Sequence, residues 1–349
     1  MPVIKAAQLE RVSSDIFQGA GLSADEAGIV ARSLVASNLK GHDSHGVIRI
    51  PQYCQLLKDG EVKAGQNVRI ERETEGSAVL DGGWGLGQVI CRQAMDLALD
   101  KAKTRTLAAV TLRQCAHIGR LGEYAEMAAE KNMVGIVMCN DHGFNPLVAP
   151  YGGTDGRMST NPIAIGIPTG GEHPIVVDMA TSVVAAGKIH VKLNQDEEMP
   201  EGWALDPEGN PTTDPKACYG PPWGSILPFG GIAAHKGFGL SLVVDLLSGA
   251  LSGAGCTRKE AEGEGNGVLL LALDIGAFTA LGDFKSEADR FLDFVKSSRL
   301  MPGFDKVMIP GEPEYRQRVM LEKEGITVDD TTWRQIGETA ASLNVKIET

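Results

Sequence analysis

The alternation of helix-type and strand-type patterns after residue 77 most constrains the fold of this chain. Short apolar runs such as "LAAVTLR" (107–113) and "VGIVMCN" (134–140) are typical of buried strands. Between them lies "GEYAEMAAEKN" (122–132), whose apolar residues recur with the period of a helix. A β-α-β-α-β order of this kind predicts an α/β architecture, in which helices cover a sheet.

Both ends of the chain carry a different pattern. Ser23 and Glu26 have the spacing of a capping box at the start of a helix. Apolar residues then recur at helical intervals from Ala27 to Val35. We expect helices up to about residue 75, and a mainly helical, charged region from 285 to the end.

Composition and charge exclude several classes of function. The 349 residues carry a net charge of −12 and no basic stripe, which argues against a nucleic-acid surface. No apolar run is long enough to cross a bilayer, and no basic segment leads into a long apolar one at the N-terminus. We therefore expect no membrane segment, no secretory signal and a cytoplasmic location. The six cysteines are scattered singly, which favours reduced and mostly buried thiols over zinc sites or disulfides.

The usual nucleotide-binding fingerprints do not occur in this sequence. Neither G-x-G-x-x-G nor G-x-x-x-x-G-K-[ST] is present, and "GGWGLGQ" (82–88) has the wrong spacing. A dinucleotide-binding function therefore cannot rest on a Rossmann motif here.

The densest group of polar residues is "GHDSHGVIRIPQY" (41–53). Arg49 is its most informative member, because a guanidinium matches a carboxylate with two parallel hydrogen bonds. On a helix His45, Arg49 and Tyr53 would share one face, although Pro51 argues against an unbroken helix there. An arginine anchor beside a histidine proton carrier suits a small 2-oxo or 2-hydroxy acid. The alternative is a solvated helix start.

Two other chemistries are less well supported in this stretch. His42 and His45 lack a third ligand within easy reach, so we expect no metal site. Ser44 and His45 are adjacent, and we expect their side chains to diverge and to form no nucleophile and base pair.

His117 lies at the end of a predicted strand, just before the helix predicted for 122–132. The positive end of that helix would favour neutral imidazole and lower its pKa, as a general base near neutrality requires. Gly119 and Gly122 would let a ligand or another backbone approach closely. The alternative is a histidine that caps a turn.

Three further segments offer groups for a phosphate or a nucleotide. The stretch "APYGGTDGRMSTNPIAIGIP" (149–168) combines glycines with Thr160 and Asn161, which suit either a phosphate site or a loop held by turns. Asp178, at a predicted strand end, is placed to bind a ribose hydroxyl. Lys236, at a predicted helix start, favours an anion, with a plain surface charge as the alternative.

Together these segments resemble the non-Rossmann malate/L-lactate dehydrogenase family, which includes ureidoglycolate, sulfolactate and hydroxycarboxylate dehydrogenases, diketogulonate reductase and piperideine-2-carboxylate reductase. The resemblance runs in order from about residue 10 to about residue 335. The matching stretches are "SHGVIRIPQY" (44–53), "HIGRLGEYAE" (117–126), "APYGG" with "TNP" (149–162), "DMATSVVAAGK" (178–188), "GNPTTDP" (209–215), "HKGFGLSLVVDLLSGALSG" (235–253) and "PGE" (310–312).

The resemblance implies a fold of the α/β (α+β) class with two modules. A mainly helical module would comprise residues 1–75 with 285–349, and a mixed-sheet NAD(P)-binding module residues 76–284. Members of the family bind nicotinamide dinucleotides without a Rossmann domain, in accord with the missing fingerprint. They are typically homodimers with the active site near the subunit contact.

The resemblance also implies roles for individual residues. The proton carrier falls on His117 or on His45, and both are retained as candidates. Ser44, Arg49 and Tyr53 would bind the substrate. Contacts to the nicotinamide dinucleotide would come from Asn140, Thr160, Asn161, Asp178, Met179, Ala180, Lys236, Gly311 and Glu312. No metal is required.

We therefore predict an NAD(P)-dependent dehydrogenase that moves a hydride between nicotinamide and C2 of a small 2-hydroxy or 2-oxo acid such as malate or lactate. We expect NAD as the cofactor, with NADP as the alternative, because no arginine pair for a 2′-phosphate is evident. The rival enzyme is an NADPH-dependent reductase of cyclic imines such as piperideine- or pyrroline-2-carboxylate. A catalytically silent scaffold is the rival outside enzymes, and the presence of His45, Arg49, His117 and Lys236 argues against it.

Overall fold

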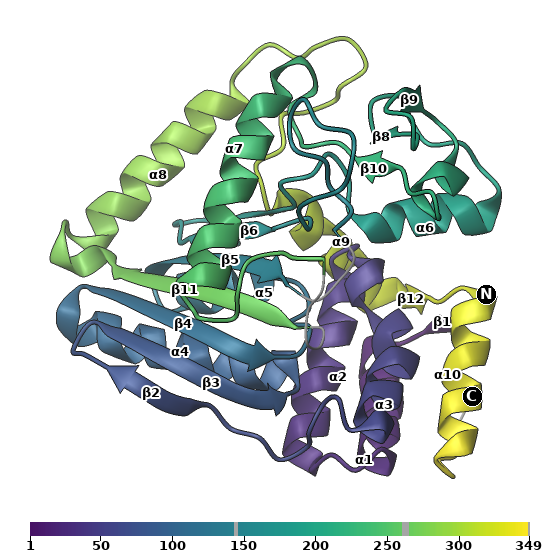
Figure 1. Cartoon of the computed structure of the whole chain (residues 1–349). Coiled ribbons are helices and arrows are strands. Elements are labelled where there is room, and N and C mark those ends of the chain that lie inside the picture. The colour runs from purple at the N-terminus through teal and green to yellow at the C-terminus, as the bar shows by residue number, and fades with distance from the viewer. Residues whose placement is uncertain (143–145, 260–264, 348–349) are drawn as a thin grey trace.

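A seven-stranded mixed sheet forms the middle of the molecule (Figure 1). The computed structural model describes residues 1–142, 146–259 and 265–347, and only the backbone at 194–195. The strands run in the order β2-β3-β4-β11-β5-β6-β7; β3 and β4 are parallel, and the other neighbours are antiparallel. Their bounds are β2 Arg69–Glu73, β3 Ser77–Gly85, β4 Leu107–Cys115, β11 Asn266–Asp274, β5 Met133–Asp141, β6 Ile163–Ile167 and β7 Ile175–Met179.

The predicted alternation of strands and helices is confirmed in its elements. Helix α4 (Gly87–Arg105) joins β3 to β4, and α5 (Gly122–Glu130) joins β4 to β5. Helix α4 packs on β4 and β11, and α5 packs on β5 and β6, so that the main hydrophobic core lies between these helices and the sheet. The predicted α/β class with a mixed sheet is therefore confirmed.

The position of β11 is not evident from the order of the elements along the chain. This strand enters the sheet between β4 and β5 and runs antiparallel to both. Before it, helix α7 (Ala234–Asp245) continues into a π-helical turn (Leu246–Ala250) that packs against β5 and β11. Figure 1 shows α7 in front of the sheet and α4 behind it.

The two ends of the chain pack together beside the sheet. Helices α1 (Ala6–Gly19), α2 (Ala24–Leu39), α3 (Ile50–Asp59) and α10 (Asp330–Ser342) share a second hydrophobic cluster. Strand β1 (Val3–Ile4) pairs with β12 (Ile326–Thr327), and both termini lie beside α10 in Figure 1. The predicted capping box is confirmed, because Ser23 and Glu26 each accept a hydrogen bond from the other's backbone N–H.

The expectation of helices up to about residue 75 is wrong at its end. Arg69–Glu73 forms the edge strand β2, and all five of its residues are exposed. This strand forms by pairing with β3 and not by burial, so its own residues carry no apolar pattern. The division into a module of 1–75 with 285–349 and a module of 76–284 stays a prediction. Helix α8 (Leu281–Lys296) has no buried residue and contributes none to the second cluster.

A third, smaller hydrophobic cluster is formed mainly by residues between β7 and α7, together with Val148 and Met158. Helix α6 (Ala186–Gln195) and a three-stranded sheet of β8 (Ala204–Leu205), β9 (Pro211–Thr212) and β10 (Ser225–Ile226) form this part. It follows β7 in the chain and lies to one side of the main sheet in Figure 1. Helix α9 (Glu312–Glu324) packs against α2.

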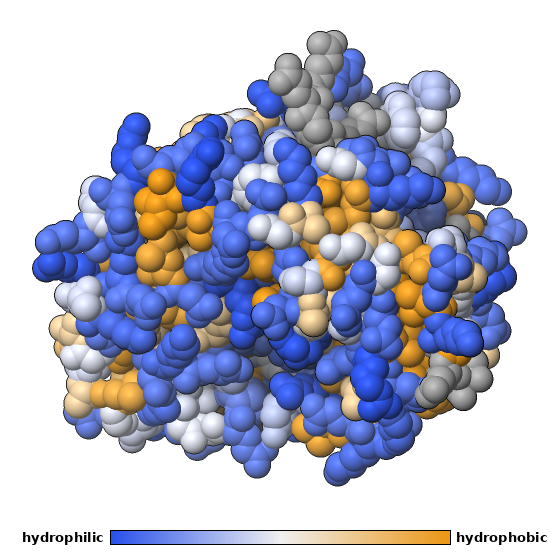
Figure 2. All heavy atoms as spheres, turned by 90° about the horizontal axis from the view of Figure 1, so that it is seen from below, coloured by the Kyte–Doolittle hydropathy of each residue, from blue (hydrophilic) through white to orange (hydrophobic). Residues whose placement is uncertain are grey.

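The surface and the cysteines agree with the expectations from composition. Figure 2 shows one face of the molecule covered mainly by hydrophilic residues, with hydrophobic residues gathered in separate patches. Among the described residues, no helix is both long enough and apolar enough to cross a bilayer. All six cysteines are free and five of them are buried, as predicted. The cytoplasmic location stays a prediction.

Candidate active site

A cavity of about 240 Å³ lies where the two cores meet. It is lined by residues from parts of the chain that lie far apart in the sequence: 44–62, 116–121, 139–141, 147, 159–162, 185–187 and 265–266. Ser44, His45, Arg49 and His117 all contribute to its wall. The structure thus brings the two predicted histidines and the predicted arginine to one cavity.

The segment from 41 to 50 is not the single helix on which residues four apart would share a face. It consists of two 3-10 turns, Asp43–His45 and Val47–Arg49, separated by Gly46. Asn38 of α2 fixes both turns, because its Oδ1 accepts from the Val47 N–H at 2.9 Å and its Nδ2 donates to Asp43 at 2.7 Å. A Cβ at position 46 would lie 2.2 Å from that Oδ1, so the close approach requires glycine.

Pro51 explains where the helix begins. Helix α3 starts at Ile50 with Pro51 in its first turn, where a proline costs no helical hydrogen bond. Tyr53 follows in that helix and is only 3% exposed. Arg49 therefore lies at the N-cap of α3 with its side chain free to reach the cavity.

The guanidinium of Arg49 is held in place by two hydrogen bonds, and its other N–H groups remain available to a ligand. Its Nε donates to the carbonyl oxygen of Ser44 at 2.7 Å, and its Nη1 donates to Gln52 at 2.8 Å. The remaining N–H groups on the two terminal nitrogens are the pair that can hold a carboxylate by two parallel hydrogen bonds.

His117 is held from behind by a short hydrogen-bond chain. Its Nδ1 lies 2.6 Å from the Tyr53 Oη, and Gln88 Nε2 of α4 donates to the same Oη at 3.0 Å. The His45 and His117 rings stack with centroids 5.4 Å apart. Tyr53, predicted to bind substrate, does not line the cavity, and its hydroxyl contacts the histidine.

The expectation that Ser44 and His45 diverge is wrong. Ser44 Oγ lies 3.0 Å from His45 Nδ1. Both residues lie in one tight 3-10 turn, and the short serine side chain reaches the near nitrogen of the next ring. The contact fixes the orientation of the His45 ring.

Burial keeps both imidazoles neutral. It lowers the pKa of His117 well below its usual value, and the charge of Arg49, with that of His45 when His45 is protonated, lowers it further. The pKa of His45 falls to about 3 through burial first and then through Arg49 and His42. The predicted fall in the pKa of His117 is confirmed in direction, and burial is its largest cause. Burial also raises the pKa of Tyr53 to about 12, so the phenol keeps its proton and its O–H can donate a hydrogen bond to His117 Nδ1.

The side-chain amides of Asn140 and Asn161, which were predicted to bind the dinucleotide, form hydrogen bonds with other residues of the protein. Asn140 and Thr160 line the cavity. The Asn140 amide donates to Asp245 at 2.9 Å and accepts from the Gly267 N–H, and the Asn161 amide donates to Ser241 and Asp245. Both side chains therefore join α7 to the sheet.

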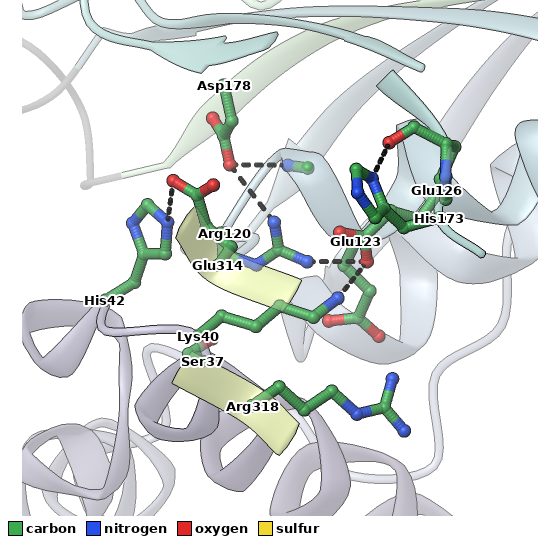
Figure 3. A network of polar contacts seen from close by, with 12 residues as sticks. Ser37, Lys40, His42, Arg120, Glu123, Glu126, His173, Asp178, Glu314 and Arg318 are labelled. Carbon is green, nitrogen blue, oxygen red and sulfur yellow. Dashed lines mark hydrogen bonds and ion pairs between the residues drawn. The ribbon is translucent and has the colours of Figure 1, made fainter. Parts of the chain in front are cut away.

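Asp178 and its neighbours lie in a buried network of charges (Figure 3). The Asp178 carboxylate accepts from the Gly122 N–H at 2.8 Å and lies 3.6 Å from Arg120 Nη1. Arg120 also donates to Glu126 at 2.7 Å, and Lys40, at the C-cap of α2, pairs with the same Glu126 oxygen. The next two predicted contacts, Met179 and Ala180, are partly exposed.

The other predicted cofactor residues do not line the cavity. Gly311 has a φ of +91°, and a Cβ there would lie 3.0 Å from the Val176 N. Glu312 forms ion pairs with Lys296 at 3.0 Å and with Arg316. Lys236 lies exposed in the first turn of α7, as its position in the sequence predicts.

Comparison with known proteins identifies the family. The family model described as malate/L-lactate dehydrogenase matches residues 4–337. The chain belongs to this family. The malate dehydrogenase of Pyrococcus horikoshii is 39% identical over 334 residues, 93% of this chain and 91% of the relative. The L-sulfolactate dehydrogenase of Methanocaldococcus jannaschii is 37% identical over 353 residues, 99% of this chain and 98% of the relative.

Solved structures of the malate/L-lactate dehydrogenase family have the same fold. The P. horikoshii malate dehydrogenase matches with a TM-score of 0.89 at 35% identity, over 99% of this chain and 97% of that one. The Δ1-piperideine-2-carboxylate reductase of Pseudomonas syringae matches with a TM-score of 0.84 at 29% identity, over 97% of this chain and 100% of that one. The predictions of the family and of a dehydrogenase are confirmed. Membership implies a nicotinamide cofactor and a small hydroxy or oxo acid substrate.

Three residues of this site were missed at the sequence level: Asn38, Gln88 and Arg120. Arg120 stands within the stretch "HIGR" that carries the family resemblance, so the pattern contained it without indicating its partners. Asn38 lies within a helix and Gln88 at the start of one, and their contacts lie 9 and 35 residues away. No local pattern marks such residues.

Proposed function

We propose that this chain interconverts a small 2-hydroxy acid, such as malate or lactate, and the corresponding 2-oxo acid with NAD as its cofactor. The observation that carries the proposal is the single cavity lined by Arg49, His45 and His117. Arg49 is the only lysine or arginine among the described residues that line it. It is therefore the anchor for the C1 carboxylate.

The residues around the cavity fit a nicotinamide ring. Glycines form part of the wall: a Cβ at Gly187 would lie 3.2 Å from Ser44 Cβ, and one at Gly265 would lie 2.7 Å from the Trp84 ring. Backbone therefore faces the cavity at these points, and a flat ring can approach it closely. When bound, the nicotinamide supplies the hydride for reduction at C2 and accepts it in oxidation.

The choice of NAD over NADP rests on the charges near the end of β7. The guanidinium next to Asp178 belongs to Arg120, which already faces Glu126 and Asp178. Figure 3 also shows Glu314, which lies 3.9 Å from His42 Nε2. A 2′-phosphate at this place would meet carboxylates, whereas a ribose hydroxyl can donate to them.

We assign the proton transfer to His117. Tyr53 and Gln88 hold its Nδ1, so Nε2 is the ring nitrogen left to exchange a proton with the substrate oxygen. In reduction C2 gains the hydride and the carbonyl oxygen gains the proton; in oxidation both leave. His45, held by Ser44, stacks on the His117 ring and limits its movement.

Substrate binding itself would prepare His117 to carry a proton. The charge of Arg49 is one cause of the low pKa of His117. A carboxylate bound to Arg49 offsets that charge and raises the pKa of the imidazole. Anchoring and proton transfer are thus coupled across one cavity.

Replacing Arg49 with Lys is expected to raise the KM for the 2-oxo acid about 10- to 100-fold, because the forked pair of hydrogen bonds is lost while the charge stays. Steady-state kinetics at saturating NADH measures this, and the KM for NADH should change little. Arg72→Lys, on the exposed strand β2, is the matched control. An unchanged KM for the acid in Arg49→Lys would remove Arg49 from the site.

A cyclic imine is the second candidate substrate. The structural match to a piperideine-2-carboxylate reductase supports it, because the same arginine would hold the ring carboxylate. Oxidation of NADH and of NADPH should be measured with pyruvate, oxaloacetate, 2-oxoglutarate and the two cyclic imines. Turnover of a 2-oxo acid with NADH supports the main proposal, and turnover of an imine alone replaces it.

We also propose that the chain forms a homodimer through α7 and α8. Leu242, Leu246 and Leu251 are 42%, 55% and 56% exposed along α7 and its π-helical end, and Phe294 of α8 is 70% exposed. Large apolar side chains exposed to this degree along helices are typical of subunit contacts.

Charge on that surface is expected to separate the subunits. The double variant Leu246→Lys, Leu251→Lys should have half the mass of the wild type in light scattering after gel filtration. Ile70→Lys, 44% exposed on β2, is the control and should keep the wild-type mass. A monomeric wild type, or a double variant of unchanged mass, would contradict this interface.

A further inference from the structure

Gln88 is buried directly behind the candidate proton carrier. It lies in the first turn of α4 and is 1% exposed. The preceding Gly87 has no room for a side chain, because a Cβ there would lie 2.2 Å from the His117 carbonyl oxygen. The start of α4 is therefore pressed against the backbone of His117, and the Gln88 amide reaches the Tyr53 hydroxyl.

Only the N–H side of the Gln88 amide forms a hydrogen bond in this structure. Its Nε2 donates to Tyr53 Oη at 3.0 Å, while its Oε1 is buried and has no hydrogen-bond partner among the described residues. A buried acceptor without a partner is costly and is rarely retained without a reason. An apolar side chain of the same size would avoid this cost at position 88.

We propose that Gln88 is a positioning residue that keeps His117 hydrogen-bonded through Tyr53 in both of its protonation states. The proposal rests on the role of His117 given above. It deepens that role, because it says how the protein supports both the resting neutral imidazole and the imidazolium that gives its Nε2 proton to the substrate.

In the arrangement of the structure, the proton lies on His117 Nε2. Gln88 Nε2 donates to Tyr53 Oη, which leaves the Tyr53 O–H to donate to His117 Nδ1. The neutral ring then has no proton on Nδ1, so its proton is on Nε2, towards the substrate.

When His117 carries a second proton, every donor in the chain must reverse. The Nδ1–H then donates to Tyr53 Oη, and the Tyr53 O–H needs a new acceptor. A turn of the Gln88 amide by about 180° places Oε1 at the position now held by Nε2 and supplies that acceptor. An amide carries both a donor and an acceptor, so it serves either state without gaining or losing a proton itself. In reduction the imidazolium gives its Nε2 proton to the substrate oxygen and keeps Nδ1–H, so the turned amide also serves the neutral ring that results. In oxidation that ring takes the proton back at Nε2.

The other polar groups around Tyr53 and His117 do not replace Gln88. Arg49 has no acceptor. The His45 ring uses its Nδ1 for Ser44, and the Cys115 thiol donates to the carbonyl oxygen of Ala116. These are the titratable and charged groups that act on Tyr53 and His117 from the turns and from β4.

Two variants separate positioning from packing. Gln88→Leu keeps the volume and removes both hydrogen-bonding groups; we expect kcat to fall about 10- to 100-fold in both directions, with the KM for NADH within about threefold of the wild type. Gln88→Glu, when ionised, can only accept; it favours the arrangement with a proton on Nδ1, and the pH profile of kcat should move to higher pH. Gln93→Leu, in the same helix and bonded to Asn67, is the control.

The double variant with Tyr53→Phe tests whether Gln88 acts through Tyr53. If it does, adding Gln88→Leu to Tyr53→Phe should lower kcat by no more than about twofold further. Full additivity, or an unshifted pH profile in Gln88→Glu, would overturn the proposal. If His117→Ala keeps its turnover, the role of His117 fails; if His117→Ala loses turnover and Gln88→Leu does not, only the role of Gln88 fails.

Discussion

His117→Ala is expected to lower kcat for 2-oxo acid reduction by about 10²- to 10⁴-fold, the range that general acid catalysis contributes. The physical reason is that the variant lacks the imidazole, whose Nε2–H would give the carbonyl oxygen its proton as C2 is reduced. Arg49 and the rest of the cavity wall remain, so the KM values for acid and NADH should change far less than kcat. Steady-state kinetics with each ligand varied in turn measures the separation.

His45→Ala is the comparison that decides between the two histidines. His45 is held by Ser44 and stacks on His117, so its loss should loosen the ring beside it without removing the proton carrier. We expect a smaller fall in kcat than for His117→Ala. If His117→Ala keeps turnover within a few-fold and His45→Ala does not, the proton carrier is His45 and the chain through Tyr53 serves packing.

The residues of the site could be predicted from the sequence where chemistry is concentrated in short stretches. Arg49 and His45 stand in one such stretch and His117 in another, and the family resemblance indicated that they share a site. The structure places all three on one cavity. The amphipathic helices and buried strands were predicted for the same reason, because their periodicity is local.

The contacts that support the site could not be predicted in this way. Tyr53 and His117 are 64 residues apart, and Gln88 comes from a third element, so their chain of hydrogen bonds depends on how α3 and α4 pack. Strand β11 lies between β4 and β5 although it follows them by more than a hundred residues. Pairing order of this kind is decided by tertiary packing, and no local pattern carries it.

The ion network of Figure 3 depends most on Arg120, whose side chain is 3% exposed. Burial raises the pKa of Asp178, and Arg120 and the Gly122 N–H oppose that rise. Burial also acts to raise the pKa of Glu126, but the charges of Arg120 and Lys40 bring it below its usual value. One guanidinium therefore lowers the pKa of two largely buried carboxylates, between α5 and β7, below what burial alone would give.

Arg120→Met is expected to lower the free energy of unfolding by about 3 to 5 kcal/mol at pH 7, the cost of leaving buried charge unpaired. Methionine fills much of the same volume, so the loss reports charge more than packing. Lys40 still faces Glu126 in the variant, but Asp178 keeps only the Gly122 N–H. Urea unfolding at a fixed protein concentration measures the change. Arg334→Met removes an exposed pair with Glu338 and should change stability by less than about 1 kcal/mol.

The pH dependence of this loss distinguishes charge from packing. In the wild type the pKa of Glu126 is depressed, so its contribution to stability is present at neutral pH and is lost as the pH falls through that pKa. In Arg120→Met burial dominates, and the pKa values of Glu126 and Asp178 rise, so acid neutralises charges that destabilise the variant. The difference in free energy of unfolding between the wild type and Arg120→Met should therefore become smaller as the pH falls from 7 towards 4. A gap that stays constant with pH would show that Arg120 stabilises the fold by packing and not by pairing with the two carboxylates.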